Sequence, residues 1–166
     1  VLAGGGVERL VIYLLTGYPG EDEEVLRRTG LFLNRLKEAS RGARLEIHIN
    51  TVVPKPWTPL QFYPLPAPGK LKERAEALAR ICRECGTVKI KSVRSALRQA
   101  VLSLGGEQVG AAAIEFAKGE ISWKKALRKH GVDPSFIHSP REDFPWHRIE
   151  GPVSEEQLRH KYLERG

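Results

Sequence analysis

The chain has no methionine, only two cysteines and only two asparagines. Two cysteines three positions apart, Cys82 and Cys85, cannot form the disulfide framework of a small secreted domain. The longest apolar run is about Leu10 to Leu15, whereas a membrane-spanning helix needs about 18 or more apolar residues. No basic and then apolar leader opens the chain. We therefore expect a cytoplasmic protein with no membrane partner.

The missing methionine also bears on the origin of the chain, because Val1 is not an initiator residue. The chain is processed, truncated or cut from something longer, and we favour a piece of a longer protein. Arginine outnumbers lysine 16 to 11, and thermolabile side chains are few. This composition favours a thermophilic source and says nothing about activity.

Enough apolar residues are present for a folded core, since 41% of the 166 residues are hydrophobic and 28% are charged. Disorder is therefore excluded, and one domain or slightly more is expected. The net charge of +7 would attract phosphate polyanions such as RNA. The cations occur singly or in pairs with acids between them, which is typical of a solvated surface. RNA therefore stays open as a partner.

Hydrophobic periodicity predicts a strand, a helix and a second strand in the first third of the chain. Residues 10–16 form a short apolar run, typical of a strand buried on both faces of a parallel sheet. Residues 17–20 form a turn, residues 22–39 repeat apolar positions at helical spacing, and residues 44–53 alternate with period two. Such a βαβ unit nearly always crosses over right-handed and places its two strands side by side in parallel.

Prolines dominate the next segment, with six of them in residues 54–68. The segment also contains Trp57, Phe62 and Tyr63, and we expect an extended ordered loop with these aromatic side chains on the surface. Beyond it, helical periodicity and stop signals predict helices at 71–85, 93–104, 107–118, 122–130 and 154–164, and a short strand at 87–91.

The pair Cys82 and Cys85 lies at the end of one of these predicted helices, on or near its apolar side. A CxxC pair can be half of a zinc site, a redox pair or part of a core. A zinc site needs two further ligands, and a redox pair usually follows a strand, as in thioredoxin-like proteins. We favour packing in the core, and metal binding and redox chemistry stay open.

Two strings that contain glycine and proline follow the two predicted strands: YLLTGYPGEDEE at residues 13–24 and VVPKPWTPLQ at residues 52–61. Together and in this order, they resemble the later strands of radical S-adenosylmethionine (radical SAM) enzymes. The closer similarity is to the subgroup that often carries a cobalamin-binding domain ahead of its barrel. The similarity continues through FPWHRI at residues 144–149 and the closing helix that begins near Ser154.

The resemblance implies an α/β fold. Residues 1–68 would be the carboxyl-terminal strands of a parallel (β/α) barrel, and residues 69–166 a mostly helical extension with one short strand. The parent enzyme would use S-adenosylmethionine and a 4Fe-4S cluster, with cobalamin as a further cofactor in the cobalamin-binding subgroup. The upstream half of the barrel would be the partner of this piece, whose unpaired strand edges would favour a homodimer in isolation.

Residues of the cofactor pocket also follow from the resemblance. Family members contact S-adenosylmethionine partly through main-chain groups at the ends of these strands, which here correspond to Leu15, Gly17, Glu21, Val53 and Pro54. The cluster of the family is held by three cysteines spaced CxxxCxxC, because three thiolates leave one iron open to the cofactor. This spacing is absent here. We therefore expect a piece that is inactive alone, and its catalytic residues stay unassigned.

The second predicted strand offers a candidate substrate face. Glu46, His48 and Asn50 alternate along it with apolar residues. In a closed parallel barrel the apolar side of a strand meets the helices, so these three polar side chains would face the interior and the substrate. The alternative is an edge strand with this side in water.

A second class of function is a non-catalytic binding module. In that case the basic surface and the aromatic loop at Trp57, Phe62 and Tyr63 would bind RNA or a partner protein. An upstream CxxxCxxC motif in the open reading frame separates the two classes, since only the enzyme needs it.

Overall fold

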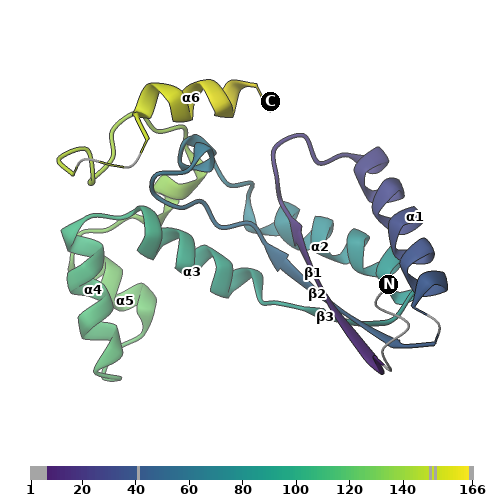
Figure 1. The fold of residues 1–166 in the computed structure, drawn as a ribbon. Coiled ribbons are helices and arrows are strands. Elements are labelled where there is room, and N and C mark those ends of the chain that lie inside the picture. Colours follow the sequence, from purple (N-terminus) through teal and green to yellow (C-terminus); the bar gives the residue numbers. More distant parts are fainter. Residues whose placement is uncertain (1–6, 41, 150, 152, 165–166) are drawn as a thin grey trace. The chain divides into compact units, whose positions relative to one another are not determined.

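The computed structural model describes residues 7–40, 42–149, 151 and 153–164. In chain order, its elements are β1 (Arg9–Thr16), α1 (Glu23–Ala39), β2 (Arg44–Thr51), η2 (Pro59–Phe62), α2 (Pro68–Arg83), β3 (Thr87–Ile90), α3 (Val93–Leu104), α4 (Glu107–Ala117), α5 (Trp123–Lys129), η3 (Pro134–His138) and α6 (Glu155–Leu163), where η marks a 3-10 helix (Figure 1). The predicted α/β class is confirmed. No described helix is long and apolar enough to cross a membrane.

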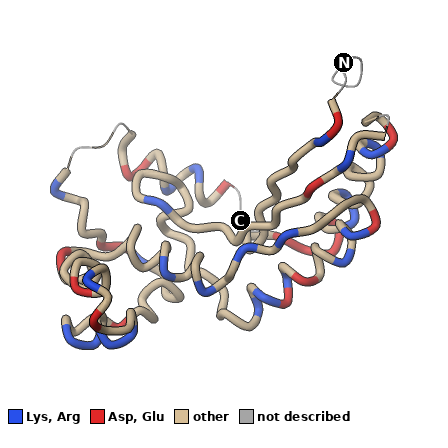
Figure 2. The backbone as a smooth tube through the Cα atoms, turned by 90° about the horizontal axis from the view of Figure 1, so that it is seen from below, with Lys and Arg blue, Asp and Glu red and all other residues tan. Residues whose placement is uncertain are grey.

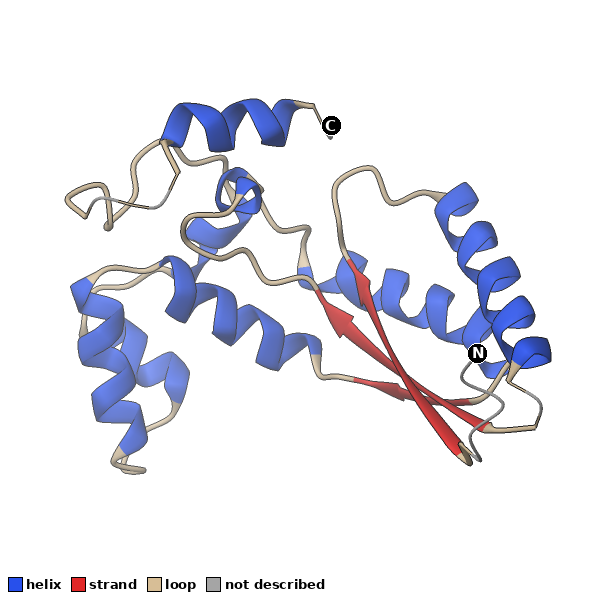
Figure 3. Ribbon diagram, viewed as in Figure 1, coloured by secondary structure: helices blue, strands red, loops and turns tan. Residues whose placement is uncertain are grey.

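The three strands form one sheet in the order β1-β2-β3, and both strand pairs are parallel (Figure 3). β1 and β2 pair over their whole length, with Leu10 opposite Leu45 and Tyr13 opposite His48. β3 pairs with the other edge of β2, where Lys89 lies opposite His48. The prediction that the first two strands lie side by side in parallel is therefore confirmed.

One face of this sheet carries a hydrophobic core. The apolar residues of β2 are at most 4% exposed and pack beneath α1 and α2. The members of the cluster include Leu10, Ile12 and Leu14 of β1, Leu45, Ile47 and Ile49 of β2, Leu33 of α1, and Ala75, Leu78, Ala79 and Cys82 of α2. The apolar side of the second strand thus meets the helices as predicted, because this arrangement removes the apolar surfaces of sheet and helices from water together.

Local signals explain where α1 begins and how closely it packs. The Asp22 carboxylate caps the helix by accepting a hydrogen bond from a backbone N–H of the first turn at 2.9 Å. Glu23 and Glu24 occupy that turn, where the helix dipole favours negative charge. Gly30 faces α2, and a Cβ there would lie 2.8 Å from the Ile81 side chain. The missing side chain therefore lets α1 approach α2 closely.

The opposite face of the sheet is exposed along β1. Val11, Tyr13 and Leu15 keep 38%, 67% and 50% of their surface accessible. The prediction of a strand buried on both faces is therefore wrong for β1. An apolar sequence permits such burial, but α1 and α2 both pack on the other side of the sheet, so these side chains need a further segment to cover them.

The contacts divide the chain into two compact units. Unit 1 comprises Val1–Val52 and Ala67–Ala96, and unit 2 comprises Val53–Pro66 and Leu97–Gly166. This division differs from the expected one after residue 68. α2 and β3 belong with the sheet because they bury its apolar face and extend its edge, whereas the proline-rich segment belongs with the later helices.

Within unit 2, the proline-rich segment places its aromatic residues differently from the prediction of a surface loop. Phe62 and Tyr63 are only 4% and 9% exposed, whereas Trp57 is half-buried. Phe62 ends η2 and packs edge to face on Phe144, with ring centroids 5.5 Å apart. Aromatic side chains bury large apolar areas, and unit 2 uses them to build a core among short helices. The surface placement of Phe62 and Tyr63 is therefore wrong.

Replacement of Leu33 by alanine tests the position of the core of unit 1. Leu33 is fully buried, so L33A should lower the free energy of unfolding by about 2–5 kcal/mol. The matched control is L31A on the same helix, where the leucine is 46% exposed and the loss should stay near about 0.5 kcal/mol. Urea unfolding followed by circular dichroism measures both variants. Equal losses would contradict the orientation of α1.

Candidate functional site

A polar network lies on the exposed face of the sheet, away from α1 and α2. At its centre is the Glu46 carboxylate of β2, which accepts a hydrogen bond from Nζ of Lys89 on β3. Arg9 of β1 forms an ion pair with it at 3.6 Å, and Nε2 of His48 lies 2.6 Å from it. The network therefore links all three strands.

The neighbouring donors determine the ionisation of Glu46. Hydrogen bonds from Lys89 and then from His48 lower its pKa from the ordinary value of 4.5 to about 2. A carboxyl group with so low a pKa is a poor general acid or base near neutral pH. Its role in this arrangement is to hold Lys89 and His48 in place, so the groups left to meet a ligand are the imidazole and the cations around it.

Aromatic and apolar surface adjoins the network. Tyr13 lies beside His48, with ring centroids 5.0 Å apart and an interplanar angle of 66°. In the next row toward the carboxyl ends of the strands, Leu15 lies opposite Asn50. The face therefore combines a phenol ring, an imidazole, an amide and the two cations Arg9 and Lys89. Such a mixture can bind a ligand that has both an apolar part and a negative charge.

The residues predicted as substrate-facing, Glu46, His48 and Asn50, all lie on this face, because they alternate with the buried Leu45 and Ile47 along β2. The structure brings Glu46 and His48 into contact. The side chain of Asn50 makes no hydrogen bond with any residue that the structure describes. The amide of Asn50 is therefore available to a ligand, as is Nδ1 of His48, because among the described residues the imidazole bonds through Nε2.

The turn after β1 is closed by Glu21. Its carboxylate accepts hydrogen bonds from the Gly17 N–H at 2.7 Å and from the Thr16 hydroxyl at 3.0 Å. Gly17 has a φ of +90°, and a Cβ there would lie 2.8 Å from the Leu71 side chain, so both conformation and packing require glycine. The Val52 N–H donates to the Thr16 carbonyl at 2.8 Å. The ends of β1 and β2 are therefore adjacent.

Five residues at these strand ends were predicted as cofactor contacts. Gly17 and Glu21 satisfy each other's hydrogen bonds within the turn. Leu15 points to the exposed face of the sheet and is half exposed. Val53 is half-buried and Pro54 is buried, both directly after the end of the paired region of β2. Among these five residues, Leu15 is exposed and Val53 is half-buried, whereas Gly17 and Pro54 are buried.

Cys82 and Cys85 are free thiols in the core of unit 1, 0% and 6% exposed. Burial raises the pKa of Cys82 to about 11 and raises the pKa of Cys85 as well. Sγ of Cys85 donates a hydrogen bond to Oδ1 of Asn34 at 3.2 Å. Within the described ranges, no group of three or more His, Cys, Asp or Glu residues could hold a metal ion. These contacts support the packing interpretation of the CxxC pair.

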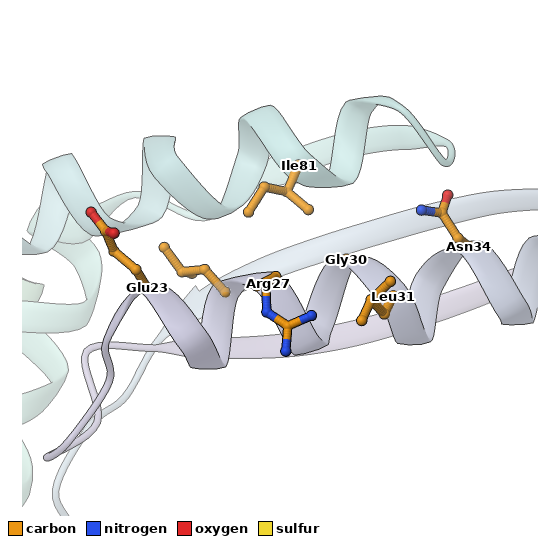
Figure 4. Close-up of a pocket in the computed structure, with 7 residues that line it drawn as sticks. Glu23, Arg27, Gly30, Leu31, Asn34 and Ile81 are labelled. Carbon is orange, nitrogen blue, oxygen red and sulfur yellow. The ribbon is translucent and has the colours of Figure 1, made fainter.

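A shallow groove of about 410 Å³ lies between α1 and α2 (Figure 4). Its apolar lining includes Leu26 and Leu31 of α1 and Ile81 of α2. None of the residues predicted as site residues lines it. The groove is on the helical side of unit 1, whereas the polar network is on the opposite side of the sheet.

Lys89 and Arg9 are members of the network that the sequence did not reveal as site residues. Lys89 lies 43 positions from Glu46, and only the pairing of β2 with β3 brings the two together. One signal was present, because Thr87 and Lys89 alternate with Val88 and so mark a polar side of the short strand. The alternation shows which residues of the strand share a side, but it does not show which residue of β2 lies opposite Lys89.

No family model matches the chain, and no solved structure matches it. The chain is 25% identical over 146 residues to an uncharacterised protein of Methanocaldococcus jannaschii, an alignment that covers 87% of this chain and 32% of that protein. The chain thus spans about a third of the length of the relative it matches. Similarity at this level does not assign the chain to a family.

The network predicts a pH dependence of stability. Because the pKa of Glu46 is about 2 in the folded state and 4.5 ordinarily, its charged form stabilises the fold above pH 4.5, and this contribution is lost as the pH falls from 4.5 to 2. Carbon-13 NMR of the Glu46 carboxyl should report a pKa near 2. In K89A this pKa should rise toward 4.5, and in the control K91A it should not move. An unchanged value in K89A would contradict the network.

The buried cysteines predict slow thiol chemistry. The thiolate is the reactive form, and both burial and the raised pKa of Cys82 suppress it. With Ellman's reagent, the native chain should release almost no colour, and the chain unfolded in urea should release two equivalents. The control S139C introduces an exposed thiol and should react as one fast equivalent. If Cys82 or Cys85 reacts at the rate of that thiol, the packing interpretation is wrong.

Proposed function

We propose that this chain is a carboxyl-terminal part of a radical SAM enzyme. Its sheet would form part of the wall of a parallel (β/α) barrel, with α1 and α2 outside and the network around Glu46 inside. The ends of β1 and β2 would contribute main-chain and apolar contacts to S-adenosylmethionine. The residues Glu46, His48 and Asn50 would face the substrate.

One observation carries the proposal: the sheet has its helices on one face and exposed apolar side chains on the other. Parallel sheets occur almost only with both faces covered, yet Val11, Tyr13 and Leu15 are 38–67% exposed. A closed barrel covers such a face without helices, because inward side chains meet those of the other strands. The two strings that resemble the family lie at adjacent strand ends, which supports the same interpretation.

The residues at the strand ends fit S-adenosylmethionine in part. Leu15 offers exposed apolar surface, and Val53 is half-buried. Gly17 and Glu21 bond to each other, so their role would be to shape the turn and not to touch the cofactor. We therefore assign contact with the cofactor to Leu15 and Val53. Pro54 is fully buried, so its role, like that of Gly17 and Glu21, would be to shape the strand ends.

A 4Fe-4S cluster does not fit this chain. The cluster needs three accessible thiolates, and Cys82 and Cys85 are two buried thiols with raised pKa values. We place the cluster ligands in a part of the parent enzyme outside this chain, and we assign no reaction step to the cluster. The match to about a third of a longer relative agrees with a parent protein of larger size.

The coding sequence upstream of Val1 provides the first test. We expect it to encode a CxxxCxxC motif. The full-length protein, reconstituted anaerobically with iron and sulfide and reduced with dithionite, should form 5′-deoxyadenosine from S-adenosylmethionine, measured by liquid chromatography and mass spectrometry. The 166-residue chain, treated in the same way, should form none. A reading frame without the motif, or activity of the 166-residue chain alone, would overturn the proposal.

Replacement of Leu15 by glutamate in the full-length protein tests the cofactor wall. L15E places a charge on the exposed face at the end of β1 and should weaken binding of S-adenosylmethionine at least tenfold. L31E is the matched control, since Leu31 is a similarly exposed leucine on the outer side of α1. It should change the affinity by less than twofold. Equilibrium dialysis with labelled cofactor measures both, and equal losses would refute the assignment of this face.

A further inference from the structure

Helix α5 of unit 2 has an unusual charge pattern. Its seven residues, WKKALRK, include four cations and no acid. Residues 118–130 hold five Lys or Arg and one acidic residue, Glu120, and so contribute +4 to the net charge of +7 of the whole chain. Figure 2 shows the distribution of Lys and Arg (blue) and of Asp and Glu (red) along the chain. More than half of the excess charge thus lies on thirteen residues.

Three of these cations form a surface that we call the α5 patch: Lys124, Lys125 and Arg128. All three are exposed, and none has a side-chain hydrogen bond or ion pair with any residue among those described. Lys129 differs from them, because Glu115 of α4 binds it and also lies 2.9 Å from Nε2 of His130. The charge of the patch is therefore not neutralised within unit 2.

The patch does not stabilise its own helix. Lys124 and Lys125 lie in the first turn, which contains no acidic residue, although the helix dipole favours negative charge there. Lys124 and Arg128 are four positions apart, a spacing at which like charges repel. An external anion removes both costs. The charge pattern is therefore better explained by a ligand than by folding.

The orientation of α5 is fixed by contacts on its other side. Ala126 and Leu127 are 0% and 3% exposed, and Trp123 packs edge to face on Phe116 of α4 at 5.6 Å. The Arg98 guanidinium of α3 lies 4.8 Å from the Phe116 ring centroid. At about 100° per residue, the patch occupies the arc opposite these buried positions. Unit 2 therefore presents the three cations together, away from its core.

The chemistry of the patch favours a phosphate backbone. An anionic membrane binds amphipathic helices through their apolar side, and the apolar side of α5 is already buried. Lys124 and Arg128 are separated by about 6 Å along the helix, which is less than the width of about 12 Å of a DNA major groove, so they reach one strand only. α5 also lacks the Asn and Gln side chains that read adenine edges, and its Lys and Arg side chains can bind the phosphates of any sequence. These features suit a single strand bound through its phosphates.

We propose that the α5 patch docks single-stranded RNA through its phosphate backbone. RNA loops present unpaired, bendable strands, which a rigid patch of this size can contact without crossing a groove. The aromatic loop considered from the sequence is not part of this surface, because Phe62 and Tyr63 are buried. The proposal does not depend on radical SAM chemistry and would stand if that function failed.

The test uses the 166-residue chain and a fluorescein-labelled 12-nucleotide oligouridylate, with binding followed by fluorescence anisotropy from 25 to 300 mM KCl. The triple variant K124A/K125A/R128A should bind at least tenfold more weakly at low salt. The slope of log K against log salt should fall by about 2, because each lost phosphate contact removes about 0.7 for a single strand. Circular dichroism verifies that the variant remains folded.

The control variant is K70A/K72A/R80A, which removes three exposed cations from α2 and leaves the same net charge. It should bind within twofold of the unmodified chain, and equal losses in both variants would overturn the proposal. The affinity for a 12-nucleotide oligodeoxythymidylate should be within about threefold of that for the oligouridylate, since the proposed contacts are made to phosphates. Equal or tighter binding of a 12-base-pair DNA duplex, of phosphatidylserine vesicles or of poly-glutamate would also overturn it.

Discussion

Burial of one face of a parallel three-stranded sheet is the constraint on which unit 1 depends. β2 contributes fully buried apolar residues to that face, and α1 and α2 cover it with leucines, alanines and a cysteine. Three features follow from packing two helices on one small sheet: the close approach of α1 to α2 at Gly30, the tight packing of Gly17 against Leu71 and the burial of both thiols. The residues on these surfaces therefore have structural roles first.

The same constraint creates the candidate site. Because both helices lie on one side, the alternate residues of all three strands are left together on the other side, where Glu46 links β1, β2 and β3 through Arg9, His48 and Lys89. On the same face, exposed Tyr13 lies opposite His48, and exposed Leu15 lies opposite Asn50 one position further along the face. Such a surface on a parallel sheet needs a cover, and the proposed barrel wall supplies one while explaining why the polar groups converge there.

Unit 2 is held together differently, since it has no sheet to organise its helices. Aromatic rings make many of the contacts between its elements. Phe62 packs on Phe144, Phe116 packs on Trp123, and the Arg98 guanidinium lies over the Phe116 ring. The sequence suggests that Phe62 and Tyr63, in the proline-rich segment, lie on a surface and stack on a ligand. In the structure both side chains are buried in the core of unit 2. In unit 2, the exposed cations Lys124, Lys125 and Arg128 lie together on α5, where the first turn of the helix favours negative charge instead.

The sequence by itself determined the secondary structure of most of the chain and the apolar side of β2, because periods of two and 3.6 residues are local and do not depend on partners. It also indicated that Glu46, His48 and Asn50 share a side. Only the tertiary structure decided which faces are covered: it exposed one side of β1, buried Phe62 and Tyr63, grouped α2 with the sheet and brought Lys89 to Glu46. Each of these depends on contacts between residues far apart in the chain, and local periodicity carries no information on register or on the segment that covers a face.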